Sequence, residues 1–166
     1  MKKLGFMQGR LVPDEHNTIQ SFPWKNWKKE FQLSKKLKIN IMEWTIDNER
    51  FYSNPINNYE GRKTIKKLSV NYNLKIKSIT CDFFMQSPYF ISKNSQTFHK
   101  LKKLIDNASK LKIKFLVLPL VDNSSIKNYY YEKKFVQKTL ELKKILKKNN
   151  MSIIFESDYK PKKLFN

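Results

Sequence analysis

The chain has 166 residues, of which 34 are lysine or arginine and 14 are aspartate or glutamate, so its formal net charge is +20. Hydrophobic residues make up 40% and aromatic residues 14%, which is enough for a packed core and excludes a wholly disordered chain. No apolar run approaches the roughly 20 residues of a membrane span, and the single Cys81 excludes a disulfide framework. We expect one cytoplasmic domain.

Lysine carries almost all of the positive charge. Arg10, Arg50 and Arg62 are the only arginines in the sequence. A surface that binds phosphate usually includes arginine, whose planar guanidinium binds phosphate oxygens bidentately. We therefore interpret the charge mainly as a solvated lysine surface, with a polyanion-binding face as the alternative.

Five short apolar runs recur along the chain at an interval of about 38 residues, at 4–7, 39–44, 76–81, 115–120 and 152–156. Each run is rich in β-branched or aromatic residues, which is typical of a buried strand. Between them, apolar residues follow helical spacing over 27–37, 65–72, 98–111 and 135–146. This βαβαβαβαβ alternation predicts a parallel sheet with right-handed crossovers.

Two architectures fit this order of elements. An open doubly wound sheet is complete at five strands, whereas a (β/α)8 barrel needs about 250 residues, so the chain would hold the first five strands of a barrel. The sequence has only three glycines, Gly5, Gly9 and Gly61, and no glycine-rich phosphate loop. This counts against a nucleotide-binding Rossmann or P-loop fold.

A polar or acidic residue follows every predicted strand. In chain order these residues are Gln8 and Arg10, Glu43 and Asp47, Asp82, Asp122, and Glu156 and Asp158. The carboxyl ends of parallel strands carry the chemistry in α/β folds. A carboxylate beside an apolar strand is costly unless it is paired, hydrogen-bonded or metal-bound. The pattern therefore predicts a polar site at this end of the sheet.

These residues each have two interpretations. Glu156 and Asp158 lie on the same side of an extended strand, where they either bind a divalent cation or act as general acid and base; alternatively, Glu156 pairs with a lysine and Asp158 caps a turn. Glu43 either contacts substrate or pairs with Arg10 across the top of the sheet. Arg10 itself binds an anionic or hydroxylated ligand, or it fixes a loop. Asp82 contacts a ligand or caps a loop.

Several motifs resemble the opening half of sugar phosphate isomerase/epimerase proteins of the xylose-isomerase-like TIM-barrel superfamily. They lie at 4–11 (LGFMQGRL), 19–27 (IQSFPWKNW), 41–44 (IMEW), 81–85 (CDFFM) and 155–158 (FESD). The resemblance implies an incomplete (β/α)8 TIM barrel of about five parallel strands and four helices, in which residues 1–166 form a single partial domain. It also implies a sugar or sugar-phosphate isomerase or epimerase.

The resemblance further implies a divalent metal, Mn, Mg, Co or Zn, held by carboxylates and a histidine. Glu156 falls where the family places its first metal-binding glutamate, and Glu43 falls near an acid that acts close to substrate. We therefore predict that Glu156 and Glu43 are catalytic and that Glu156 binds the metal. We predict that Gln8, Arg10 and Asp82 contact the substrate.

The family's remaining metal ligands, an Asp, a His and a second Glu, come from strands six to eight, which would follow Asn166. We therefore expect a truncated chain that is inactive alone, whose partner is a small carbohydrate or sugar phosphate and not a membrane. Two alternatives stay open. One is a nucleic-acid-binding or abasic-site endonuclease-like module of the same superfamily, and the other is a non-catalytic interaction fragment that self-associates through exposed sheet edges.

Overall fold

The computed structural model describes residues 4–13, 21–47, 50–91 and 96–160. These residues form one parallel sheet with the strand order β1-β2-β3-β4-β5. The strands are β1 (Gly5–Met7), β2 (Ile41–Thr45), β3 (Lys75–Thr80), β4 (Phe115–Leu120) and β5 (Ser152–Ser157). A doubly wound sheet reverses its strand order at a switch point, so the strictly sequential order rules out that architecture and confirms a partial TIM barrel.

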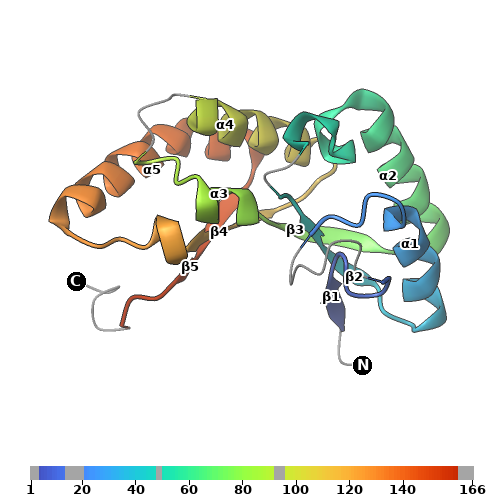
Figure 1. Ribbon diagram of the computed structural model, residues 1–166. Helices are drawn as coiled ribbons and strands as arrows, with labels where there is room; N and C mark the ends of the chain where they lie inside the picture. Colours follow the sequence, from blue (N-terminus) through green and yellow to red (C-terminus); the bar gives the residue numbers. More distant parts are fainter. Residues whose placement is uncertain (1–3, 14–20, 48–49, 92–95, 161–166) are drawn as a thin grey trace.

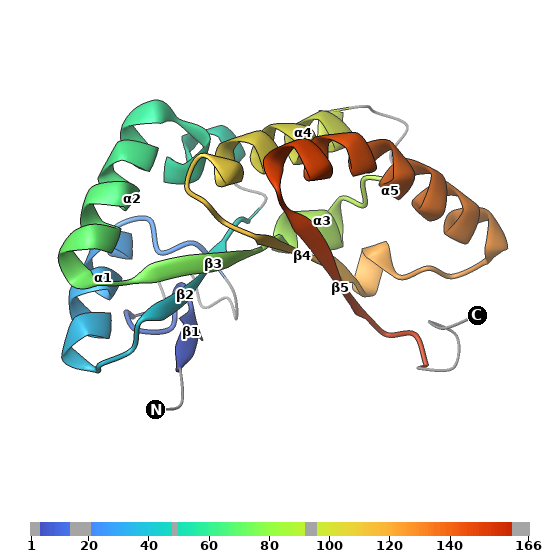
Figure 2. The same cartoon turned by 180° about the vertical axis from the view of Figure 1, so that it is seen from behind.

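Five α-helices join these strands in the described part of the chain. They are α1 (Trp27–Lys36), α2 (Tyr59–Tyr72), α3 (Asp82–Gln86), α4 (Gln96–Ser109) and α5 (Tyr129–Asn149). Helices α1, α2, α4 and α5 lie along the outer side of the curved sheet (Figures 1 and 2) and confirm the four predicted helices. The short helix α3 was not predicted. None of the described helices has the length and apolarity needed to cross a bilayer.

Three single turns of 3-10 helix lie in the connections that follow β2 and β4. They are η1 (Phe51–Ser53), η2 (Pro55–Asn57) and η3 (Asp122–Ser124). Helix α3 follows β3 in the same way, and α3 packs against η3. Figure 1 views this end of the sheet, with α3 in front of β4. The connections at the carboxyl ends of β2, β3 and β4 therefore contain short helical turns.

The core fills the space between the outer face of the sheet and the long helices. Trp44 of β2 is fully buried, and its ring packs edge-on against Trp27 of α1 with a centroid distance of 5.7 Å. Leu116 and Leu118 of β4 are likewise fully buried. Full burial of a large apolar side chain contributes about 1.5–3 kcal/mol to stability, so these strands are fixed by their outward-facing residues.

The opposite face of the sheet carries Glu43 and Glu156. Glu43 is only partly buried, between two buried neighbours in β2, so it points away from the helices. In the strand register Glu43 is paired with Ser78, Ser78 with Phe115, and Phe115 with Ser152. Paired residues share a face and side chains alternate along a strand. Glu156, four residues beyond Ser152, therefore lies on the same inner face as Glu43.

Candidate functional site

The turn after β1 buries Gln8 at the carboxyl end of the sheet. Gly9 has a φ of 94°, and a Cβ at this position would lie 2.8 Å from the carbonyl oxygen of Ser21, so the turn requires glycine. Gln8 is 1% exposed; its backbone N–H donates to the carbonyl oxygen of Glu43 at 2.9 Å, and its Oε1 accepts from the backbone N–H of Thr45 at 3.2 Å. Its Nε2 is buried and has no hydrogen-bond partner among the described residues.

Glu43 accepts a hydrogen bond from Ser78, and not from Arg10. Its Oε2 lies 2.5 Å from the Oγ of Ser78 on the neighbouring strand. Arg10 is exposed, and the ion pair found in the described part of the chain joins Lys138 to Glu141. The interpretation of Glu43 as the partner of Arg10 is therefore wrong, and the Arg10 guanidinium faces solvent beside the site.

Asp82 is the first residue of α3 and lies close to three other carboxylates. Its Oδ1 accepts from the Oγ1 of Thr80 at 3.2 Å. Burial is the largest effect on Asp82, and together with the negative charges of Glu156, Glu43 and Asp47 it raises the pKa of Asp82 to about 6. The hydrogen bond from Thr80 opposes these effects. Asp82 is therefore a member of a carboxylate cluster and not only a loop residue.

Glu156 and Asp158 lie at the carboxyl end of β5 and are both exposed. The Oδ2 of Asp158 accepts from the Oγ of Ser125 at 2.7 Å, which links the end of β5 to the connection after β4. This contact agrees with the interpretation of Asp158 as a turn residue. No described lysine forms an ion pair with Glu156, so the lysine-paired interpretation of Glu156 finds no support in the described residues.

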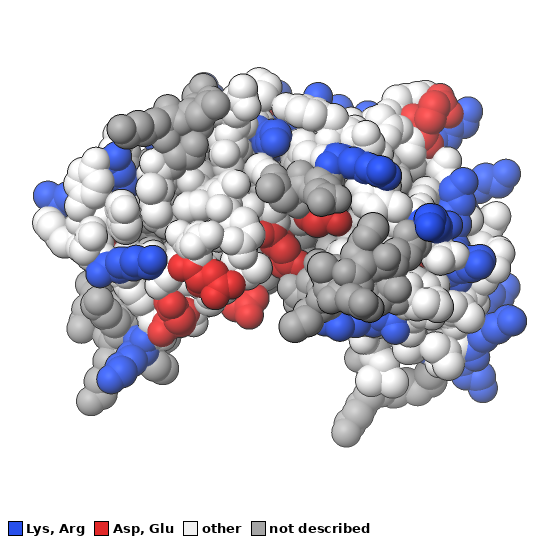
Figure 3. Space-filling model, viewed as in Figure 1, with Lys and Arg blue, Asp and Glu red and all other residues white. Residues whose placement is uncertain are grey.

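The four carboxylates Glu43, Asp47, Asp82 and Glu156 form what we call the acidic cluster. In Figure 3 acidic side chains run in a band from the centre toward the lower left, over the carboxyl ends of the strands, while lysines lie mostly around it. The chain as a whole has a net charge of +20. A local concentration of negative charge is therefore opposite in sign to the average surface, and it attracts cations or hydroxyl donors.

The described residues do not complete a metal site. Among them, no group of three or more His, Cys, Asp or Glu side chains is placed to hold a metal ion. His16 lies outside the described residues, and His99 lies on α4. The acidic cluster can therefore offer individual carboxylate ligands, but not the closed ligand set of a structural metal centre.

Glu30 is a buried acid that the sequence analysis missed. It lies on α1 and is fully buried, and its Oε1 accepts from the backbone N–H groups of Gly9 at 2.8 Å and of Leu11 at 3.2 Å. Burial raises the pKa of Glu30 to about 7, while the backbone hydrogen bonds lower it. The available signal was its position on the apolar stripe of α1, next to Phe31 and three residues after Trp27.

Solved structures of other proteins share this arrangement. A xylose isomerase domain protein from Planctomyces limnophilus matches with a TM-score of 0.67 at 10% identity, over 98% of this chain and 56% of that one. D-psicose 3-epimerase in the presence of D-fructose matches with a TM-score of 0.64 at 11% identity, over 90% and 50%. The IolI protein with a bound zinc atom gives 0.64 at 15% identity, over 94% and 51%.

No family model matches the sequence, and no curated protein sequence matches it either. The chain therefore has the fold of xylose isomerase-like TIM-barrel proteins, a likeness carried by structure and not by sequence identity. It spans about half the length of the chains that it matches. The neighbours include two sugar epimerases and a zinc-bound protein.

Proposed function

We propose that the carboxyl ends of β1–β5 form part of the active site of an enzyme that isomerises or epimerises a small sugar or sugar phosphate. The acidic cluster is the observation that carries this proposal. Burial and the repulsion between its carboxylates raise the pKa of Asp82, and groups perturbed in this way are concentrated at binding and catalytic sites. In TIM barrels the substrate binds at this end of the strands.

Glu43 is the proposed acid/base residue. It lies on the inner face of the sheet, is partly exposed to the barrel interior, and is held in one orientation by Ser78. A carboxylate fixed in this way can remove a proton from the carbon next to a sugar carbonyl, which leaves an enediolate. Return of the proton to the former carbonyl carbon, with transfer of the hydroxyl proton between the two oxygens, isomerises the sugar. Protonation of the original carbon on its other face by a second acid epimerises it.

Three further residues are proposed to bind the substrate. The buried amide of Gln8 has a donor, Nε2, that has no partner among the described residues and suits a sugar hydroxyl. Asp82 accepts hydrogen bonds from hydroxyl groups in either protonation state. The exposed guanidinium of Arg10 suits the phosphate of a sugar phosphate.

Glu156 is the proposed metal ligand, and the metal is a divalent cation. The described residues supply too few ligands for a complete site, so we propose that Glu156 contributes to a site whose other ligands come from further strand–helix units. By this proposal residues 1–166 are inactive alone, which agrees with the match to about half of each neighbouring chain.

The test is solvent exchange. The chain is mixed with a separate polypeptide that carries the last three strand–helix units of D-psicose 3-epimerase, and ketoses and ketose phosphates are incubated in D2O with Mn²⁺. We expect NMR to detect deuterium at the carbon next to the carbonyl only when both polypeptides are present. Glu43→Gln should abolish the exchange, while the exposed Glu60→Gln serves as the matched control.

A second measurement covers the case in which the two polypeptides do not associate. Saturation-transfer NMR on the chain alone should detect binding of D-fructose 6-phosphate, weakened by Arg10→Gln and not by Arg50→Gln. Absence of binding would refute the proposal in that case, and absence of exchange would refute it in a mixture shown by scattering to be a 1:1 complex.

Two alternative functions are nucleic-acid binding and self-association through the sheet edges. The nucleic-acid alternative is not favoured, because the carboxyl ends of the described strands carry several carboxylates, which repel the polyanionic backbone of a nucleic acid. Self-association through the sheet edges stays a prediction: β1 and β5 are the edge strands of the described sheet, and unpaired strand edges favour pairing with another chain. Sedimentation equilibrium checks it, and a monomer at all concentrations would contradict it.

A further inference from the structure

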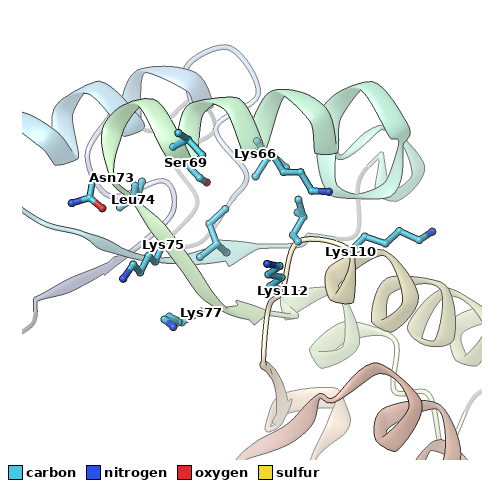
Figure 4. A pocket seen from close by; sticks show the side chains of 12 residues that line it. Lys66, Ser69, Asn73, Leu74, Lys75, Lys77, Lys110 and Lys112 are labelled. Carbon is cyan, nitrogen blue, oxygen red and sulfur yellow. The ribbon is translucent and has the colours of Figure 1, made fainter.

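A groove of about 790 Å³ opens away from the acidic cluster, between α2, the amino end of β3 and the turn from α4 to β4. Five lysines line it. Lys66 extends from α2, Lys75 and Lys77 lie along β3, and Lys110 and Lys112 lie on the turn (Figure 4). We call this feature the lysine groove. It lies at the amino end of β3, so it is separate from the proposed active site.

The floor of the lysine groove is aliphatic. Ile65, Leu74 and Ile76 line it and are buried beneath it. Val70 stands on its wall and is 79% exposed, more than any other large hydrophobic side chain in the described part of the chain. A cavity that combines an apolar floor with charged walls is suited to an amphipathic ligand.

The positive charge in the groove is uncompensated. No acidic residue lines it, and its lysines form no ion pair with the described residues. Lys110 makes one polar contact, from its Nζ to the Oδ1 of Asn107 at 3.4 Å. Like charges drawn from three separate elements repel one another, and a bound anion relieves that repulsion.

We propose that the lysine groove binds an acidic segment of a partner protein, with carboxylates on the lysines and aliphatic side chains on the floor. The lining contains no aromatic side chain on which a base could stack and no arginine to bind phosphate bidentately. Binding of single-stranded nucleic acid relies on such groups, so the lining favours an acidic peptide. Because the groove lies at the opposite end of the sheet, the partner leaves the acidic cluster accessible.

A smaller hollow adjoins the lysine groove, and a nucleic acid is the competing ligand to be tested there. It shares Lys66 and Lys110 with the groove and adds Tyr59, Arg62 and Lys63. The Arg62 guanidinium already donates to the carbonyl oxygen of Ile56 at 2.9 Å. Tyr59 is 70% exposed and is the one aromatic ring of this hollow. A nucleic acid on this surface would therefore depend on Tyr59, whereas the proposed peptide would not.

The test uses three fluorescent probes with the full 166-residue chain. They are a peptide of about 16 glutamate and leucine residues, the same peptide with glutamine in place of glutamate, and a single-stranded oligothymidine of equal length. Of the three probes, we expect only the acidic peptide to bind. Its affinity should fall as the salt concentration rises from about 50 to about 300 mM, because the Debye length shortens. Failure of the acidic peptide to bind at low salt would overturn the proposal.

Paired variants locate the site. The double variant Lys75→Gln/Lys112→Gln should weaken peptide binding about fivefold or more, since each exposed ion pair contributes modestly. The control is Lys143→Gln/Lys147→Gln on the exposed face of α5, which removes the same charge. An equal loss in both double variants would show diffuse attraction to a basic chain and would refute a specific groove.

Three further variants test the groove wall and the class of ligand. Val70→Asp places a negative charge on the groove wall and should abolish peptide binding, while Val136→Asp on the exposed surface of α5 should not. Both sites are exposed, so neither change disturbs the core. If oligothymidine binds more tightly than the peptide and loses affinity in Tyr59→Ala, the surface is a nucleic-acid site and the proposal is wrong.

Discussion

Replacement of Glu30 by glutamine is expected to remove a pH dependence of folding stability. The Glu30 carboxylate is fully buried, its Oε1 accepts the N–H groups of Gly9 and Leu11, and its Oε2 is buried with no hydrogen-bond partner among the described residues. Only one oxygen is therefore compensated when the group is ionised. This explains why burial outweighs the backbone hydrogen bonds and raises the pKa of Glu30 from 4.5 to about 7.

The sign and size of this pH dependence of stability follow from proton linkage. Between pH 4.5 and pH 7 the folded state binds more protons at Glu30 than the unfolded state, so stability falls as pH rises. A change in pKa from 4.5 to about 7 lowers the free energy of unfolding by about 2.5 kcal/mol between pH 5 and pH 8. Glutamine keeps an oxygen that accepts from Gly9 and Leu11 but cannot ionise, so this contribution disappears in Glu30→Gln.

Urea unfolding measures the effect, with tryptophan fluorescence as the probe because Trp27 lies one helical turn before Glu30 in α1. The difference in unfolding free energy between Glu30→Gln and wild type should grow in favour of the variant by about 2.5 kcal/mol from pH 5 to pH 8. The exposed Glu60→Gln is the matched control and should give a flat difference. A flat difference for Glu30→Gln as well would refute the reasoning.

Three further changes test other parts of the structure. Gly9→Ala should lower the free energy of unfolding by about 1–3 kcal/mol in urea, because φ is 94° and the new Cβ meets the Ser21 carbonyl; Gly5→Ala is the control. Asn54→Ala should cost about 1–3 kcal/mol by the same measurement, because it leaves the buried Nε1 of Trp44 without its acceptor. Asp82→Asn should stabilise the protein more at pH 8 than at pH 5, because burial and its carboxylate neighbours raise the pKa of Asp82 to about 6; a pH-independent effect would contradict this.

Much of the fold could be predicted because buried parallel strands consist of short apolar runs that are visible in the sequence. The helix limits could not, since exposed residues extend helices beyond their apolar stripe. Helix α5 begins at Tyr129, six residues before its predicted start, because the side chain of Asn128 accepts from the N–H of Tyr131. It ends where Asn150 takes a left-handed conformation with a φ of 50°.

The site was predictable only in part. Carboxylates that follow apolar strands are visible in the sequence, and the structure brings Glu43, Asp82 and Glu156 close enough for their charges to interact. Their hydrogen-bond partners were not visible, since they depend on which residues the sheet places side by side. Glu30 was missed for a related reason: a charged residue in a lysine-rich helix suggests a solvated face, and only the packing of α1 under the Gly9 turn buries it.

A shift in register between β2 and β3 affects residues of both the acidic cluster and the lysine groove. In the pairing of β2 with β3, Ile41 is opposite Lys75 and Met42 is opposite Ile76. The register then shifts by one residue, so that Glu43 is opposite Ser78. Without this bulge Glu43 would be paired with Lys77, whose ammonium group would neutralise the carboxylate inside the barrel. The extra residue instead leaves Lys77 exposed in the lysine groove and gives Glu43 a hydroxyl donor. The local register of β3 therefore decides that Ser78, and not Lys77, is paired with Glu43.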